Sequence, residues 1–239
     1  MDNSISFPKR SLPTDALEVL YEDNHLISVN KPAGILMQGD RSGEESLMDV
    51  VKEYIRERYQ KPGDVFLGMV HRLDRPVSGV VLFARTSKAA SRLMRQWQAL
   101  EVKKTYWAVV EGALEPEQGR IEGHLRKSGK RVRTAKEGDP GAKEAVLEYR
   151  TLAHGNGVSL VEIGLITGRK HQIRAQLSQA GCPVVGDVKY GANGFLKDKT
   201  IRLVARSLSF RHPVAGREMI LSVDTGALER EFSMPIHLR

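Results

Sequence analysis

The second half of the chain is a succession of short apolar segments separated by turn residues, and this pattern constrains the fold most. It predicts strands over Thr105–Glu111, Gly119–Leu125, Ala145–Leu152, Val158–Ile166, Ile201–Phe210 and Glu218–Val223. Most connections between these strands are too short to hold a crossover helix, so successive strands should pair antiparallel. An α+β fold with a mainly antiparallel sheet is therefore expected, and a doubly wound fold is disfavoured.

The first half of the chain predicts four further strands. Leu17–Glu22 and Leu26–Lys31 form an opening hairpin, whereas Val65–Val70 and Gly79–Ala84 are apolar runs typical of buried strands. The polar loop His71–Pro76 lies between these last two. We therefore expect the loop to be held by the core on both sides.

Two helices are predicted in the first half from the spacing of apolar residues. The first follows a capping-box pattern at Ser42 and Glu45 and runs to about Tyr59. The second begins after Thr86 and ends in a Lys103-Lys104 pair, whose positive charges suit a helix C-terminus.

No repeat, low-complexity tract or linker divides the chain. We expect an N-terminal extension over residues 1–16 and one catalytic domain over residues 17–239. The chain has no run of 18 apolar residues and no secretory signal, so we expect a cytoplasmic protein without membrane association. The single cysteine, Cys182, excludes a disulfide framework and should be buried. We expect a monomer with no obligate protein partner.

Positive charge is concentrated in one segment. The formal net charge is +8, and residues 120–136 contain seven basic residues and one acidic residue. Such a surface suits a polyanion, and Lys130, Arg131 and Arg133 are the candidates for contact with it. The alternative is a solvated hairpin whose charges only aid solubility.

Two polar segments are candidates for chemistry. In the first, Arg72-Leu73-Asp74-Arg75, a lone carboxylate stands among guanidinium groups; the plainer interpretation is an ion pair that fixes a turn. The second, Gly168–Arg174, lies where a strand should meet a helix over about residues 170–180. Free backbone N–H groups and basic side chains at such a junction can bind an anion.

Common nucleotide-binding, hydrolase and metalloprotease motifs are absent from the sequence. The spacing of His71, Asp74 and His171 leaves a metal site open, although the neighbouring arginines would repel a divalent cation. We therefore expect no metal.

At this point the sequence resembles a family, the RluA-type pseudouridine synthases. The resemblance covers about Leu17 to Val223 and rests on motifs in the family's order: Asn30-Lys31-Pro32-Ala33-Gly34, His71-Arg72-Leu73-Asp74 with Ser78-Gly79, Lys104-Thr105-Tyr106, Gly168-Arg169-x-His171-Gln172-Ile173-Arg174, Gly186-Asp187-x-x-Tyr190-Gly191 and His212-Pro213-Val214. The departures are Val77 and Lys170, where the family usually has Thr.

The resemblance implies a single catalytic domain with a mixed, mainly antiparallel sheet, flanking helices and a cleft across the sheet. The separate N-terminal RNA-binding domain that many relatives carry in front is not expected here. It implies that uridine in ribosomal or transfer RNA is isomerised to pseudouridine without a cofactor. Asp74 would be the catalytic carboxylate, Arg174 its partner, and Tyr106 the residue that stacks on uracil and relays a proton. The alternatives are a surface charge for Arg174 and an ordinary strand aromatic for Tyr106.

The same resemblance implies that the target base is flipped out of its helix. Arg72 would fill the vacated space, while other basic side chains bind phosphates and RNA shape. The residues expected to contact RNA are His71, Arg72, Arg169, His171, Lys130, Arg131 and Arg133. Two rival functions stay open at this point: a non-catalytic RNA-binding protein and a metal-dependent RNA hydrolase.

Overall fold

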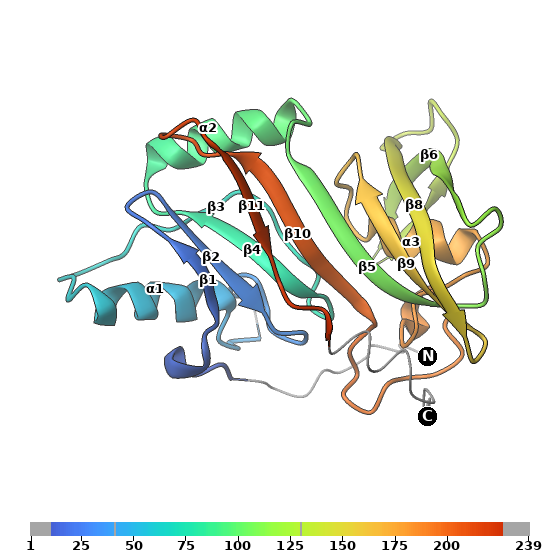
Figure 1. Ribbon diagram of the computed structural model, residues 1–239, viewed down its shortest axis with the longest axis horizontal. Coiled ribbons are helices and arrows are strands. Elements are labelled where there is room, and N and C mark those ends of the chain that lie inside the picture. Colours follow the sequence, from blue (N-terminus) through green and yellow to red (C-terminus); the bar gives the residue numbers. More distant parts are fainter. Residues whose placement is uncertain (1–10, 41, 130, 227–239) are drawn as a thin grey trace.

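The computed structural model describes residues 11–40, 42–129 and 131–226, which form one mixed sheet with helices beside it. Figure 1 shows α1 beside β1 and β2, α2 near the ends of β10 and β11, and α3 beside β6, β8 and β9. The strands are β1 (Val19–Glu22), β2 (Leu26–Lys31), β3 (Gly68–Met69), β4 (Ser78–Ala84), β5 (Lys103–Glu111), β6 (Gln118–Ser128), β7 (Arg131–Ala135), β8 (Lys143–Gly155), β9 (Val158–Leu165), β10 (Leu203–Arg211) and β11 (Glu218–Ser222). The helices are α1 (Leu47–Arg58), α2 (Ser87–Gln98) and α3 (Gln172–Gln179), with short 3-10 turns η1 (Thr14–Ala16) and η2 (Val188–Tyr190).

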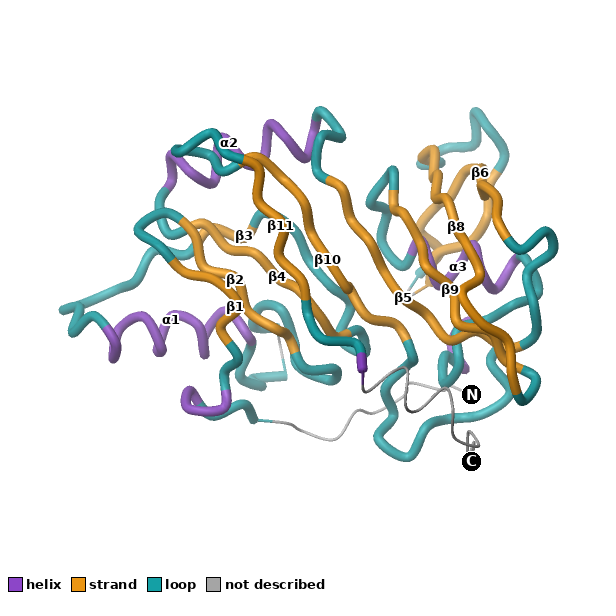
Figure 2. The backbone as a smooth tube through the Cα atoms, viewed as in Figure 1, coloured by secondary structure: helices purple, strands orange, loops and turns teal. Residues whose placement is uncertain are grey.

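The sheet has 11 strands, in the order β1-β2-β4-β10-β5-β9-β8-β6-β7, with β3 beside β4 and β11 beside β10. Among the described pairs only β4 and β10 run parallel. Figure 2 shows how far strands outweigh helices in this chain. The predicted α+β class and mainly antiparallel sheet are confirmed.

The first helix begins later than predicted. The Ser46 side chain accepts a hydrogen bond from the Asp49 amide, and the Asp49 carboxylate accepts one from the Ser46 amide, so the capping box is Ser46–Asp49. The predicted cap at Ser42 is wrong, because its hydroxyl instead accepts the amide of Glu44 in an exposed turn.

The second helix ends earlier than predicted. Leu100 has φ +57°, a left-handed conformation that stops the helix, and Lys103 and Lys104 already belong to β5. The predicted strand Val65–Val70 pairs only over its last part, as β3.

The basic segment contains a strand that was not predicted, β7, which forms a hairpin with β6. It was missed because it has one buried residue, Val132, and Arg131 and Arg133 on either side of it are exposed. Lys130 lies outside the described residues.

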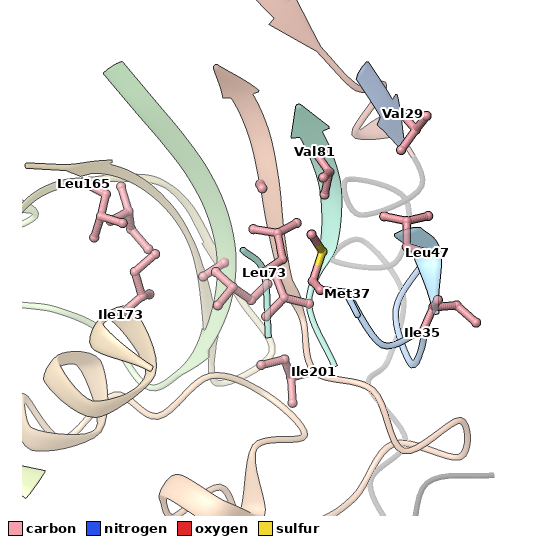
Figure 3. Packing of buried hydrophobic residues seen from close by; sticks show 14 of the residues in the cluster. Val29, Ile35, Met37, Leu47, Leu73, Val81, Leu165, Ile173 and Ile201 are labelled. Carbon is pink, nitrogen blue, oxygen red and sulfur yellow. The ribbon is translucent and has the colours of Figure 1, made fainter. Parts of the chain in front are cut away.

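The main hydrophobic core reaches the loop between β3 and β4 from both sides. Leu73 and Val77, which flank Asp74, are 6% and 3% exposed and belong to this core. Figure 3 shows Leu73 near Met37 and Ile201, with Leu165 and Ile173 to one side. The core therefore anchors the loop, as the sequence predicts.

Three other predictions concern the N-terminal extension, Cys182 and membrane-spanning helices. Of the expected N-terminal extension, residues 1–10 lie outside the described part, while Leu12 packs against the main core and Thr14–Ala16 form η1. Cys182 is 4% exposed, so its predicted burial is confirmed. Across the described ranges, no helix is both long enough and apolar enough to cross a membrane.

Candidate active site

A cleft of about 2030 Å³ gathers the candidate residues from loops far apart in the sequence. It is lined by His71, Arg72, Asp74, Tyr106, Arg131, Arg169, His171 and Arg174. Of the described candidates, only Arg133 does not line it. Most of its charged residues are basic, which suits RNA phosphates.

Asp74 lies at the turn of the loop between β3 and β4. The Val77 amide donates to the Asp74 carbonyl at 3.1 Å, which closes the turn. The loop then enters β4 at Gly79, where φ is +116° and an added Cβ would lie 2.2 Å from the Ala205 carbonyl oxygen. Only glycine permits this approach of β4 to β10, so Gly79 fixes the end of the loop that carries Asp74.

Lys31 fixes the same loop by hydrogen bonds to its carbonyl groups. This structural role could not be predicted from the motif that contains Lys31. Its ammonium is fully buried and donates to the carbonyls of Pro32, Arg75 and Val77 at 3.0, 3.1 and 2.7 Å. Burial lowers the pKa of Lys31 to about 7, although the charge of Asp74 opposes this. Three carbonyl acceptors require three N–H donors, so the bonding favours the charged ammonium.

Arg174 joins two carboxylates. Its Nη1 donates to Asp74 Oδ2 at 2.9 Å, while Nε and Nη2 donate to Asp187 Oδ2 and Oδ1 at 2.6 and 2.8 Å. Burial alone would lower the pKa of Arg174, but hydrogen bonds and charges of Asp187 and then Asp74 outweigh it and raise the pKa. Arg174 is therefore a buried, charged partner of both carboxylates and does not lie at the surface.

Exposure differs sharply within this trio. The side chains of Arg174 and Asp187 are 6% and 1% exposed, whereas that of Asp74 is 23% exposed. Asp187 therefore orients the guanidinium from behind, and Asp74 is the carboxylate that a substrate can reach. Asp187 was not predicted as a site residue, and its only sequence signal was its place in Gly186-Asp187-x-x-Tyr190-Gly191.

Tyr106 lies on β5 and lines the cleft near Asp74. Burial raises the pKa of its phenol, and the negative charge of Asp74 raises it further. The hydroxyl is therefore protonated at neutral pH. Tyr106 can offer a flat ring and a neutral hydroxyl at this position.

The loop before α3 is organised by the buried side chain of Gln172. Its Oε1 accepts from the Thr167 hydroxyl at 2.8 Å and from the Arg169 amide at 2.9 Å, and its Nε2 donates to the Val146 carbonyl. The predicted anion site at this junction thus has one amide already occupied. The Arg169 side chain donates a hydrogen bond from Nε to the Glu144 carbonyl.

His171 occupies a strained position directly before α3. Its φ of +51° is left-handed, which is uncommon for a residue with a side chain and often marks functional sites. Nε2 lies 3.7 Å from Asp74 Oδ1, and Nδ1 lies 2.7 Å from the Tyr190 hydroxyl. Burial, aided by the charges of Arg174, Lys189 and Lys170 and opposed by that of Asp74, lowers the pKa of His171 to about 4.

His71 faces another part of the cleft wall. Its ring stacks on Trp97 with centroids 5.2 Å apart, and Nε2 accepts the Leu82 amide at 2.9 Å. Burial and then the charge of Lys104 lower its pKa to about 4. In the described parts of the chain, no three His, Cys, Asp or Glu residues converge as a metal site, so His71, Asp74 and His171 do not form the metal-dependent hydrolase centre considered above.

These two histidines predict a loss of stability in mild acid. Between about pH 6.5 and pH 4 the unfolded chain binds protons that the folded chain does not, so the stability present above pH 6.5 is lost as the pH falls. We expect Tm to fall by about 5–10 °C from pH 7 to pH 4.5. The His71→Gln protein, whose amide oxygen can still accept the Leu82 amide, should lose less over the same interval. Equal losses in calorimetry would contradict the assignment to His71.

The fold is that of pseudouridylate synthase domains. Human RNA pseudouridylate synthase domain containing 4 superposes with a TM-score of 0.77 at 23% identity, covering 93% of this chain and 97% of that chain. Residues 25–179 also match the family described as RNA pseudouridylate synthase. The chain therefore belongs to the RNA pseudouridylate synthase family, whose class of activity is the isomerisation of uridine in RNA, and the resemblance seen in the motifs is confirmed.

Two relatives illustrate the match. The RNA pseudouridine synthase YhcT of Bacillus subtilis is 34% identical over 201 residues, which are 83% of this chain and 65% of the relative. The tRNA pseudouridine synthase C of Pasteurella multocida is 34% identical over 227 residues, 86% of this chain and 90% of the relative. The chain thus spans about two thirds of the first protein and most of the second.

Proposed function

We propose that this protein isomerises uridines in transfer or ribosomal RNA to pseudouridine, with Asp74 as the essential carboxylate. The observation that carries the proposal is the contact between Asp74 Oδ2 and Arg174 Nη1 at 2.9 Å inside the cleft. It combines a reachable carboxylate with a buried cation that favours its charged form.

The reaction breaks the bond between the ribose C1′ and the uracil N1, turns the base, and joins C1′ to C5. N1 gains a proton and the proton on C5 is lost at the end, so the product is an isomer of uridine and no electrons are exchanged with a cofactor. Asp74 could attack the sugar, attack the ring, or remove a sugar proton. Each route needs an ionised carboxylate at the sugar–base junction, and the cleft offers one in Asp74.

Tyr106 would stack on the uracil and relay the C5 proton. Its raised pKa favours a relay in which the hydroxyl passes on one proton as it receives another, because a phenolate is disfavoured beside Asp74. Stacking on an aromatic ring is a common means of holding an unpaired base.

RNA binding would use the basic cleft and the β6–β7 hairpin. The target uridine must leave its helix to reach Asp74, and Arg72 on the cleft wall is the proposed occupant of the space it vacates. His71, Arg169 and His171 would support the RNA beside it. The protein would act in the cytoplasm as a monomer on folded RNA.

Mapping pseudouridine in cellular RNA with and without the gene would test the proposed function. We expect discrete sites to disappear and to return when the gene is restored. Loss of sites from transfer RNA alone would agree with the name of the Pasteurella relative, and loss from ribosomal RNA would place the substrate there. An unchanged map, together with no turnover on either RNA in vitro, would contradict the proposal.

The hairpin supplies a separate prediction about affinity. Replacing Lys130, Arg131 and Arg133 by Ala should weaken RNA binding. The plot of log K against log salt concentration has a negative slope, and its magnitude should decrease by about 2, because about three phosphate contacts are lost. Filter binding across a salt series measures both effects.

A matched triple change on α1 is the control. Lys52, Arg56 and Arg58 do not line the cleft, and replacing them by Ala removes the same charge. This protein should keep the wild-type slope. Equal slopes in both triple variants would show that the hairpin does not bind RNA and that its charges only aid solubility.

A further inference from the structure

The hydroxyl of Tyr190 lies where the basic hairpin meets the catalytic cleft. Tyr190 belongs to η2 and is 7% exposed. Its hydroxyl oxygen accepts the Val132 amide of β7 at 3.0 Å and lies 2.7 Å from His171 Nδ1. The chemistry proposed above assigns no task to this group.

The hydrogens available at this oxygen favour one state of the His171 ring. The Val132 amide is a donor, so it takes a lone pair of the oxygen and leaves the single hydroxyl hydrogen free to donate. Within the described part of the chain, the acceptor found for that hydrogen is His171 Nδ1. Nδ1 is then unprotonated, and a neutral imidazole must carry its hydrogen on Nε2.

The opposite tautomer would be unfavourable at two points. With the hydrogen on Nδ1, the buried Tyr190 hydroxyl would lose its acceptor. The lone pair of Nε2 would also face Asp74 Oδ1, 3.7 Å away, and would repel its negative charge, whereas an N–H on Nε2 would attract it. The doubly protonated ring is disfavoured as well, because burial lowers the pKa of His171 to about 4.

We propose that Tyr190 is a positioning residue whose hydroxyl fixes the Nε2–H tautomer of His171, so that this N–H faces Asp74 Oδ1 while Arg174 holds Oδ2. The inference rests on the proposed catalytic role of Asp74. One carboxylate oxygen then has a hydrogen bond from the guanidinium and the other faces an N–H dipole 3.7 Å away, which favours a single geometry for attack.

The same hydroxyl bonds the hairpin, but apolar packing is what docks the hairpin beside the cleft. Val132 packs with Tyr190, Leu125, Ala145 and Ala175 in a small hydrophobic cluster, so the hairpin is docked on α3 and η2 independently of the hydroxyl. Removing the hydroxyl should therefore disturb His171 and Asp74 while the hairpin and its RNA contacts stay in place.

The test is the Tyr190→Phe protein, with Tyr149→Phe as the matched control. Tyr149 is 8% exposed, and its hydroxyl donates to the Pro116 carbonyl away from the cleft. Tyr190→Phe should lower kcat by about fivefold to thirtyfold, because the N–H that faces Asp74 is no longer held in one orientation, with KM for RNA changed less than about twofold. Tyr149→Phe should leave both constants near their wild-type values.

Nitrogen-15 NMR of the histidine rings supplies a measurement that does not depend on turnover. The signals of His171, assigned by their loss in His171→Gln, should show Nδ1 unprotonated and Nε2 protonated in the wild-type protein. Tyr190→Phe should shift them toward a mixture of tautomers. A protonated Nδ1 in the wild type, or unchanged kcat and signals in Tyr190→Phe, would overturn the inference. Lack of activity in the wild type with the expected signals would instead count against the proposed function alone.

Discussion

The Asp74→Asn protein should bind RNA as tightly as the wild type yet turn over at least about a thousandfold more slowly. The amide oxygen of Asn can still accept the Arg174 Nη1 hydrogen, so the loop and the ion-pair site should keep their shape. What disappears is the negative charge that each possible route of glycosidic cleavage requires. Release of tritium from RNA labelled at C5 of uridine measures the reaction directly, because isomerisation expels that hydrogen.

The matched control is Asp64→Asn, the same change at an exposed carboxylate outside the cleft. It should release tritium at the wild-type rate. Binding of Asp74→Asn to RNA, measured in parallel, separates loss of chemistry from loss of recognition and so tests the rival function of a non-catalytic RNA-binding protein. A rate for Asp74→Asn within about tenfold of the wild type would show that another group carries the reaction.

Much of the site could be predicted because its residues stand in short, ordered motifs. Asp74 and Arg174 are 100 positions apart, yet the resemblance paired them, and their side chains meet at 2.9 Å. The motifs also contain Lys31, Asp187 and Tyr190, but nothing in a motif tells which residue supports another. Those tasks depend on carbonyl, guanidinium and imidazole partners that only the folded chain brings within reach.

The same limit explains the errors in the fold. Apolar periodicity found nearly all long strands, because each is buried on at least one face. It missed β7, where Val132 is the one buried residue, and it overran α2 because the left-handed Leu100 gives no signal in composition. Local pattern thus predicts elements that bury apolar area, and fails where a single backbone angle or a neighbouring strand decides.

Replacing Arg174 should lower both the stability and the turnover of the protein. The two losses have different causes, because Arg174 bonds Asp187 as well as Asp74. In Arg174→Ala, the carboxylate of Asp187 is 1% exposed and loses both of its guanidinium bonds. An uncompensated buried charge costs about 3–5 kcal/mol, so Tm should fall by about 6–20 °C.

A double variant separates the two effects. In Arg174→Met with Asp187→Asn, the long side chain is kept apolar and the buried carboxylate becomes neutral, so most of the lost stability should return. Turnover should remain at least about a hundredfold below the wild type, because Asp74 still lacks the guanidinium on Oδ2. Calorimetry and tritium release on the single and double variants measure the two quantities independently. Recovery of turnover together with stability would mean that Arg174 serves only to neutralise Asp187, and that Asp74 acts without a guanidinium partner.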